Sequence, residues 1–415
     1  MDKNAPKRLV VKYGGASLAD GVRVQMAAEA VAKEVAKGNK VAVVVSAMGK
    51  TTDQLLHVAK SVSGGNMEGG ELDDVLAMGE RVSVRIFSVA LKAHGVDNRY
   101  FDPSDPDWPI ITDKTFSNAN PILEECENRV GRYVLPAFER GTVPVIAGFI
   151  GKTVDGKITT LGRGGSDTTA FILAKALRAD EIILVTDVDG IMTADPKIIQ
   201  NPQKLSRIDV NTLVGLADSG TKFIHRKALK YKDPGINAKI ISYRHGDLSQ
   251  QGTIIIGGLK MELDADLASS APAASITVVG LGLSRNPNII MELLEKVKNC
   301  SSLLGSSMDY NSTVLFVPED PNLERLLNEV HEIILRNQET VAMSVRRNLA
   351  FLRISGIGLE ETPGLIGKIS EPLRINGINI FGIMTNTSSI LLFVNWEDRD
   401  KALSLIRSSL GLKGR

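Results

Sequence analysis

Residues 159–169 read TTLGRGGSDTT and lie between a strand-like run that ends at 156–158 and an apolar helical pattern at 170–177. A glycine-rich turn from a strand into a helix leaves free backbone N–H groups that point at one place. Together with the helix dipole, these groups can bind an anion. Arg163 can hold a carboxylate through two hydrogen bonds, and Asp167 begins the helix, where a carboxylate caps well. A well-capped helix after a flexible loop would give the same pattern.

The composition is that of an ordinary globular protein. The chain has 415 residues, of which 43% are hydrophobic and 23% charged, which suggests two or three domains. The net charge is +1, so we expect no nucleic-acid partner. No apolar run approaches membrane-spanning length and no signal-peptide core precedes the first strand, so we expect a cytoplasmic protein without a membrane partner. Cys126 and Cys300 match no metal or disulfide spacing and are interpreted as buried thiols.

Strand-like and helical segments alternate over residues 1–260. Near-continuous apolar runs at 41–45, 143–149 and 181–185 are typical of strands that are buried on both faces of a parallel sheet. We therefore expect an α/β fold with a mainly parallel sheet sandwiched by helices. Such folds bind ligands beyond the carboxyl ends of their strands, which makes residues at those ends candidates for a site.

Candidate residues follow the first two predicted strands. Lys12 stands at the end of the first strand, just before a glycine turn, although a solvated lysine at a strand end is equally common. Ser46 and Thr52 follow the second strand in a loop of small residues that can supply N–H and hydroxyl groups. The loop also contains a Gly-Lys-Thr sequence, but the leading glycine of a P-loop would stand at Val44, so we reject a P-loop.

A Gly-Glu pair interrupts the apolar helical pattern at 71–91. Glycine within a helix costs roughly 1 kcal/mol relative to alanine, so close approach of another segment would explain Gly79. Glu80 beside it is a candidate for a site, although a salt-bridged surface glutamate is the commoner case.

Two later segments also carry candidate groups. Aspartates and a glycine turn at 187–190 follow a buried strand, where a nucleotide base, a ribose or metal-linked phosphates can bind, although turn-forming aspartates would look the same. The segment 218–225 offers a second lysine, Lys222. We expect His225 to make a hydrogen bond to a helix and not to act in catalysis.

The pattern changes after residue 260. Residues 264–274 are small and polar, which predicts a linker or an irregular junction. Beyond them a βαββαβ pattern of about 70 residues occurs twice, with strand-like runs that begin at 275 and 350. We therefore expect two small ferredoxin-like modules.

Five segments in this order resemble the aspartokinase family, which combines the amino-acid kinase fold with C-terminal ACT modules. They are Lys12–Ser17, Ser46–Gly49, Gly79–Arg81, Thr160–Asp167 and Thr186–Gly190. The tandem repeat is similar to a pair of ACT modules. The resemblance covers nearly the whole chain and implies three domains: an amino-acid kinase catalytic domain at 1–260, a divergent first ACT module at 261–345 and a second ACT module at 346–415.

The resemblance implies ATP-dependent phosphorylation of the side-chain carboxylate of L-aspartate. The product would be 4-phospho-L-aspartate, in the first step toward lysine, threonine and methionine. It also implies ATP as cofactor, with Mg²⁺ held mainly by the nucleotide phosphates and no metal site built from protein groups. Acetylglutamate and uridylate kinases share the scaffold, but Glu80 and the tandem modules argue against them. The set of Lys12, Asp167 and Lys222 argues against a third alternative, a non-catalytic amino-acid sensor.

The resemblance further implies a role for each site residue. Lys12 and Lys222 would contact the phosphates and stabilise the transition state from opposite sides, while Asp167 orders the lysines. Glu80 would pair with the substrate's α-ammonium and Arg163 with its α-carboxylate. Met192 stands where the family often has an aromatic residue near the adenine. The further substrate-binding residues would be Ser46, Thr52 and Ser166, and the nucleotide-binding residues Lys12, Gly14, Gly15, Ser17, Gly164, Thr186, Asp187, Met192, Lys197 and Lys222.

The ACT modules imply a homodimer or a dimer of dimers, and a site for a feedback amino acid, threonine or lysine. Such a site needs a glycine turn, because the backbone approaches the ligand closely. The second module has this turn at Gly364, with Ile378 and Asn379 before its next strand, and we place the effector there. In the first module Asn288 takes the glycine's place. If the loss of the glycine turn in the first module silences regulation, the amino acid would have no effect on catalysis. The alternative is a tandem module that serves only to dimerise the protein.

Overall fold

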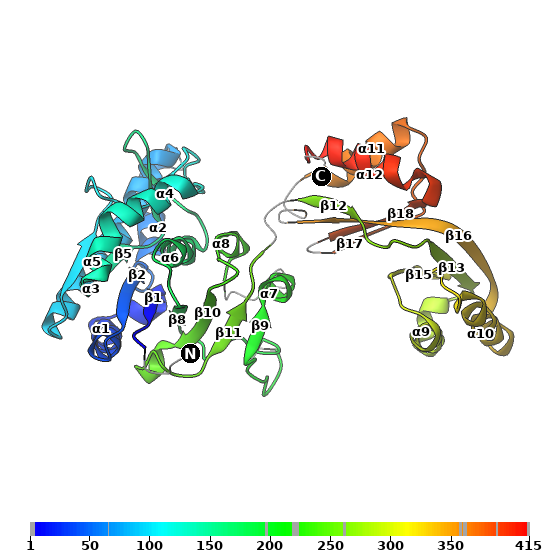
Figure 1. The fold of residues 1–415 in the computed structure, drawn as a ribbon, viewed down its shortest axis with the longest axis horizontal. Helices are drawn as coiled ribbons and strands as arrows, with labels where there is room; N and C mark the ends of the chain where they lie inside the picture. Colours follow the sequence, from blue (N-terminus) through cyan, green and yellow to red (C-terminus); the bar gives the residue numbers. More distant parts are fainter. Residues whose placement is uncertain are drawn as a thin grey trace. The chain divides into compact units, whose positions relative to one another are not determined.

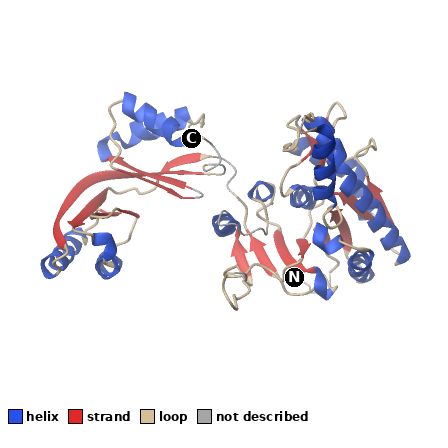
Figure 2. Cartoon of the chain, turned by 180° about the vertical axis from the view of Figure 1, so that it is seen from behind, coloured by secondary structure: helices blue, strands red, loops and turns tan. Residues whose placement is uncertain are grey.

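The computed structural model describes residues 5–64, 66–195, 198–217 (backbone only for 215–217), 224–259, 263–356, 359, 363–386 and 389–412. The chain divides into two compact units, Met1–Leu259 and Lys260–Arg415, which we call the N-terminal and C-terminal units (Figure 1). Each unit combines helices with a sheet of its own (Figure 2).

The N-terminal unit alternates strands and helices. Its strands are β1 (Arg8–Tyr13), β2 (Lys40–Val45), β3 (Asn98–Phe101), β4 (Ile111–Thr112), β5 (Val143–Ala147), β6 (Ile150–Thr153), β7 (Ile158–Thr160), β8 (Glu181–Thr186), β9 (Arg207–Asp209), β10 (Asn237–Ser242) and β11 (Thr253–Ile256). Its helices are α1 (Gly21–Ala36), α2 (Thr51–Ser63), α3 (Gly69–Ala93), α4 (Leu123–Arg129), α5 (Leu135–Glu139), α6 (Gly165–Ala176), α7 (Val210–Ala217) and α8 (Arg226–Leu229). A 3₁₀ turn at Gly15–Leu18 follows β1.

The main sheet has the strand order β3-β5-β2-β1-β8-β10-β11-β9, and its neighbouring strands are parallel except for β10 and β11. Valine-rich β1 and β2 are buried on both faces, as their β-branched side chains and apolar runs predicted. Helices α1 and α3 contact each other and pack on the sheet, and α5 and α6 also pack on its strands. The predicted parallel sheet between helices is confirmed.

This topology positions the candidate residues. The carboxyl ends of β1, β2 and β8 lie next to one another at one edge of the sheet. A second sheet, in the order β4-β6-β7, ends at Thr160 and leads into the glycine-rich turn before α6. Residues from four separate segments can therefore meet at this edge.

The C-terminal unit has one long sheet. Its strands are β12 (Asp264–Leu267), β13 (Ala273–Gly280), β14 (Gly305–Met308), β15 (Ser312–Pro318), β16 (Thr340–Ser355), β17 (Gly382–Asn386) and β18 (Ser389–Asn395). Its helices are α9 (Pro287–Cys300), α10 (Leu323–Arg336), α11 (Leu365–Ile375) and α12 (Arg399–Ser409). Helices α9 and α10 lie on one side of this sheet, and α11 and α12 lie on the other (Figure 1).

Strand β16 belongs to two βαββαβ modules. Its first part pairs with β13 and its second part with β12 and β18. The first module runs from β13 to β16, and the second runs from β16 to α12 with β12 as its fourth strand. The boundary that the sequence suggested, 345/346, falls inside β16.

The stretch 264–274, predicted as a linker, contains β12 instead. Ala265 is buried in the core of the second module, while the flanking carboxylates form ion pairs at the surface. Asp266 pairs with Arg353 at 2.8 Å, and Asp264 lies 3.7 Å from Arg407. The sequence alternates acidic and apolar residues with the period of a strand. Its small and polar composition concealed that period.

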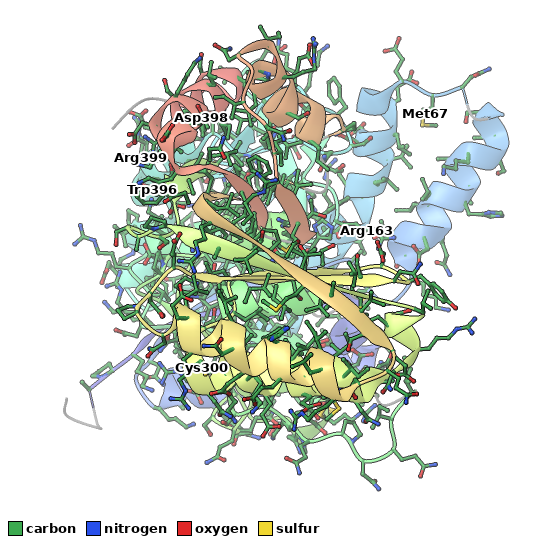
Figure 3. All side chains as sticks on the ribbon, turned by 90° about the vertical axis from the view of Figure 1, so that its right-hand side faces the viewer. Met67, Arg163, Cys300, Trp396, Asp398 and Arg399 are labelled. Atoms are coloured by element: carbon green, nitrogen blue, oxygen red, sulfur yellow. The ribbon has the colours of Figure 1, made fainter. Side chains whose placement is uncertain are left out.

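Two expectations about the rest of the chain can be compared with the structure. Cys126 and Cys300 are free and buried, as predicted, and Cys300 ends α9 (Figure 3). Burial raises the pKa of the Cys126 thiol to about 12. Among the helices of the described residues, none combines the length and the apolar character needed to cross a membrane.

Candidate functional site

The predicted residues Lys12 and Asp167 form an ion pair. Lys12 lies near the end of β1, and its Nζ is 2.7 Å from Oδ1 of Asp167 in the first turn of α6. Both side chains are largely buried. The first turn of a helix also presents free N–H groups and the positive end of the helix dipole. The pair therefore places an ammonium beside an anion-binding helix terminus.

The turn that leads into α6 is closely packed. Gly164 has φ 75°, and a Cβ added there would lie 2.6 Å from Cβ of His225. Gly162 has φ 73°, and an added Cβ would lie 2.6 Å from Oδ1 of Asn118. Glycine is required at both positions for the left-handed backbone and for the space. The chain before α6 is thus held against two other segments.

A lysine with no sequence signature supports this turn. Nζ of Lys227 donates to the carbonyl oxygens of Asn118, Ala119 and Leu161 and to Oδ1 of Asn118, over 2.7 to 3.0 Å. Burial lowers the pKa of Lys227 to about 8. One ammonium therefore joins the segment before Pro121 to the start of the glycine-rich turn.

A buried carboxylate of α3 holds the residues directly before those that Lys227 binds. Asp73 is fully buried and accepts hydrogen bonds from the N–H and hydroxyl groups of both Thr160 and Ser117. No local motif marks either Asp73 or Lys227, because their partners are distant in sequence. Both residues fix the path of the chain into the turn.

Glu80 is buried in α3 with one oxygen available. Its Oε1 accepts a hydrogen bond from the N–H of Ala47 at 3.0 Å, and Oε2 has no hydrogen-bond partner among the described residues. Burial raises the pKa of Glu80 to about 7. A Cβ on Gly79 would lie 2.8 Å from Cβ of Ala47, which confirms the predicted close approach. A buried carboxylate oxygen in this state suits a cationic ligand.

Ser46 and Ser166 join the end of β2 to the start of α6. Their hydroxyl oxygens lie 3.0 Å apart. Two other predicted substrate-binding residues do not make such contacts in the described structure. Thr52 is half-buried in the first turn of α2, and Arg163 is exposed in the turn before α6 (Figure 3).

The turn after β1 differs in part from the prediction that Gly14, Gly15 and Ser17 supply donors to a ligand. The N–H of Gly14 and the hydroxyl of Ser17 both donate to the carbonyl of Val185, and the N–H of Ser17 donates to Gly14. These donors close the 3₁₀ turn onto β8 and do not point to a ligand. A Cβ on Gly14 would lie 3.8 Å from Nζ of Lys12, so this glycine keeps the space beside the ammonium open.

The predicted nucleotide-binding residues are only partly described. Thr186 ends β8, and its hydroxyl donates to Oδ1 of Asp187 at 3.1 Å, while the Asp187 side chain is exposed. Met192 is half-buried and forms a backbone bridge with Lys204. Lys197 and Lys222 lie outside the described residues. His225 caps α8 by accepting a hydrogen bond from the N–H of Lys227, as predicted.

The predicted effector residues lie at the two ends of α11: Gly364 precedes the helix, and Ile378 and Asn379 follow its last turn. Gly364 caps this helix with φ 75°. Asn379 is exposed, whereas Ile378 is packed in the core of the second module and can offer only its backbone. The expected replacement of a turn glycine by Asn288 is wrong. Helix α9 begins at Pro287 and is capped by Asn286 with φ −112°, because the Asn286 side chain accepts the N–H of Asn288.

Comparisons with known proteins agree with this organisation. Residues 7–242 match the model of the amino acid kinase family, and residues 344–408 match that of an ACT domain. An aspartokinase from Bacillus sp. (strain MGA3) is 32% identical, with 98% of each chain covered. An aspartokinase from Thermus thermophilus is 33% identical over 97% of this chain and 98% of its own. The structure of aspartate kinase from Synechocystis is 26% identical with a TM-score of 0.77, and the match covers 98% of this chain and 70% of that chain.

Proposed function

Because this chain belongs to the aspartokinase family, we propose that it transfers the γ-phosphoryl group of ATP to the side-chain carboxylate of L-aspartate. The product is 4-phospho-L-aspartate, which supplies the pathway toward lysine, threonine and methionine. The observation that carries the proposal is the Lys12–Asp167 ion pair at the first turn of α6. Such a pair matches a reaction whose main requirement is the positioning and neutralisation of phosphoryl oxygens.

The residues beside Lys12 fit a nucleotide phosphate. Gly14 leaves open the space next to the ammonium, and α6 directs the positive end of its dipole to the same side. Lys12 meets the charge that develops on the transferring group, while Asp167 orients the ammonium. Lys222, outside the described residues, is proposed to act from the opposite side. The Mg²⁺ that accompanies ATP neutralises further charge and is held mainly by the phosphates.

The substrate aspartate carries one ammonium and two carboxylates, and the site offers a group for each kind. The available Oε2 of Glu80 pairs with the α-ammonium. Arg163 binds the α-carboxylate through two hydrogen bonds. The hydroxyl groups of Ser46, Thr52 and Ser166 donate to the carboxylates. This division of roles separates aspartate from an N-acetylated acid, which has no ammonium.

The remaining roles rest on the family resemblance. The nucleotide lies against Thr186, Asp187, Met192 and Lys197, with Gly15 and Gly164 near its phosphates. A feedback amino acid, lysine or threonine, binds beside Gly364 and Asn379. The ACT modules pair the chain into a homodimer or a dimer of dimers.

Turnover of ATP with aspartate, N-acetylglutamate or UMP as acceptor tests the proposed reaction. We expect turnover with aspartate only. Preferred turnover with either other acceptor would place the chain with a different amino-acid kinase.

A matched pair of variants tests the substrate site. Glu80→Gln should raise the aspartate KM strongly and leave the ATP KM nearly unchanged, because only the ammonium partner is lost. Glu34→Gln is the control, since Glu34 is also a buried glutamate but lies in α1 and pairs with Lys37. A defect of Glu80→Gln on the ATP side alone would mean that the two substrate positions are inverted.

A further inference from the structure

A cavity of about 370 Å³ lies at the amino ends of β1, β8 and β10, and its size suits a small molecule. Leu9 of β1 pairs with Glu181 of β8, and Ile183 of β8 pairs with Lys239 of β10. Because residues two apart in a strand share a face, all four lie on the same side of the sheet. Lys12 follows Leu9 by an odd number of residues, so it lies on the opposite side and nearer the other end of the strand.

The cavity contains a buried ion pair that is only loosely closed. Lys239 is 9% exposed, and its Nζ lies 3.6 Å from Oε1 of Glu181, which is beyond hydrogen-bond distance. Within the described part of the chain, Nζ has one hydrogen-bond acceptor, the carbonyl oxygen of Leu248 at 3.0 Å. An ammonium has three donors, so Lys239 keeps capacity for a further partner, as does the Glu181 carboxylate. Because a buried charge is costly unless it is fully hydrogen-bonded, this arrangement favours a ligand.

The charged groups on the α1 side of the cavity are already paired with one another. Glu34 is buried, and its two carboxylate oxygens accept hydrogen bonds from Nζ of Lys37 and from the Asn39 amide, each over 2.6 Å. The other atom of that amide, Oδ1 of Asn39, accepts the backbone N–H of Lys7 at 2.8 Å. These residues therefore satisfy one another and form one wall of the cavity.

The groups that remain for a ligand have opposite charges. Lys239 and, at the edge of the cavity, the exposed Lys7 can bind a carboxylate, whereas Glu181 can bind an ammonium. Leu9 and Leu248 add apolar surface beside them. An α-amino acid carries its ammonium and its carboxylate on one carbon atom, so the two groups can face two protein charges that lie 3.6 Å apart. A simple carboxylate or a simple amine would satisfy only one of them.

We propose that this cavity binds an α-amino acid with an apolar side chain. The carboxylate of the ligand pairs with Lys239 and its ammonium with Glu181, while its side chain lies against Leu9 and Leu248. The cavity is distinct from the proposed aspartate site, which lies at the carboxyl ends of the strands. It is also distinct from the proposed effector site at α11, because all the residues that line it belong to the N-terminal unit.

Calorimetric titration of the full chain with L-norleucine tests the charge pairing. Norleucine has both charged groups and an unbranched apolar side chain, whereas hexanoate lacks the ammonium and pentylamine lacks the carboxylate. Norleucine should bind about tenfold more tightly than either probe, because each probe leaves one member of the Lys239–Glu181 pair without a partner. Hexanoate or pentylamine that binds as tightly as norleucine, or a lack of norleucine binding, overturns the proposal.

Matched variants locate the bound norleucine. Lys239→Met and Glu181→Gln should each weaken its binding about tenfold, whereas Lys33→Met should leave it unchanged. Lys33 is the control because it pairs with Glu29 on α1 and does not line the cavity. If circular dichroism shows that the Lys239 and Glu181 variants are folded and both bind norleucine as the unaltered protein does, the proposal is wrong. Loss of norleucine binding in Gly364→Val would place the ligand at the effector site instead.

Protection of a thiol at the edge of the cavity provides a measurement that needs neither charge variant. Ser249 is exposed and lines the cavity, so saturating norleucine should markedly slow the alkylation of Ser249→Cys by iodoacetamide. Ser61→Cys, at an exposed position on α2, should react at the same rate with and without norleucine. The native cysteines are buried and contribute no background. A rate at Ser249→Cys that norleucine does not change would contradict binding in this cavity.

Discussion

Helices α6 and α11 begin in the same way but in different surroundings. Each follows a glycine with φ 75°, Gly164 in the N-terminal unit and Gly364 in the C-terminal unit. A Cβ added to Gly164 would lie 2.6 Å from His225, whereas a Cβ added to Gly364 would meet nothing within 4 Å. One backbone conformation thus occurs in two settings. At α6 it lets the chain pack tightly, and at α11 it lies in an exposed turn.

The packing around α6 explains how the turn can hold charged groups in place. Lys227 and Asp73 bind the chain before the turn, so the N–H groups and Asp167 of α6 keep fixed positions. Preorganised groups of this kind need no rearrangement when charge develops in a reaction. The start of α11 is exposed instead, and a Cβ on Gly364 would meet no described atom within 4 Å.

Alanine substitution of the two glycines should lower stability to different extents. Gly164→Ala adds a steric clash to an unfavourable backbone conformation and should lower the free energy of unfolding by about 3 kcal/mol. Gly364→Ala has only the conformational cost, about 1 kcal/mol. Denaturant unfolding of both variants measures the difference. Equal losses would show that packing does not distinguish the two turns.

The catalytic use of the packed turn is tested through Lys12. Lys12→Ala should lower kcat by roughly 100-fold or more with little change in stability, because the lysine meets charge that grows in the transition state. Lys33→Ala, at an exposed position on α1, is the control. A Lys12→Ala enzyme with most of its kcat would remove this residue from the mechanism.

The support of the turn is tested through Lys227. Lys227→Met removes the ammonium that joins Leu161 to Asn118 and should raise the aspartate KM about tenfold, with the ATP KM nearly unchanged. Lys175→Met, which loses only a surface ion pair, is the control. Steady-state kinetics with each substrate varied in turn gives both constants. Equal increases in both would indicate general loosening of the fold.

The protonation of Glu80 should appear in the pH dependence. Its pKa is raised to about 7, so the carboxyl is mostly protonated at pH 6 and mostly ionised at pH 8. Only the ionised form pairs with the ammonium, so kcat/KM for aspartate should rise nearly tenfold over this interval. In Glu80→Gln the rise should disappear. A profile that falls with pH would mean that the protonated carboxyl binds the substrate.

The last prediction concerns the exposed turn before α11. Valine at Gly364 would obstruct a ligand at the start of α11, so Gly364→Val should weaken binding of lysine or threonine about tenfold. We expect the free-energy coupling between effector binding and catalysis to be about 1–3 kcal/mol. Calorimetric titration of both amino acids into wild type, Gly364→Val and Asn288→Ala measures the binding. Binding that survives in Gly364→Val but disappears in Asn288→Ala would move the effector to the first module.

Local patterns in the sequence predicted the elements that depend on local chemistry. The valine-rich strands, Lys12 at a strand end and Asp167 at a helix start all follow from short-range signals. Lys227 and Asp73 could not be predicted, because each acts through contacts between segments distant in sequence. The sequence predicted that Gly14 and Ser17 donate hydrogen bonds to a ligand. It does not reveal that the carbonyl oxygen of Val185, distant in sequence, accepts these hydrogen bonds. Asn288 was misplaced because Asn286 and Pro287 start the helix earlier than its apolar pattern indicates.

Strand β12 has a consequence for the order in which the chain can fold during synthesis. It leaves the ribosome before the whole first module, yet its partner is the last part of β16. At about 5–20 residues per second, β12 waits several seconds for this partner. A nascent chain halted before β16 exposes β12 as an edge strand, which invites pairing with other chains. The first module is therefore inserted in the sequence between β12 and the rest of the second module. A protein truncated between the two modules would lack β12, the fourth strand of the second module.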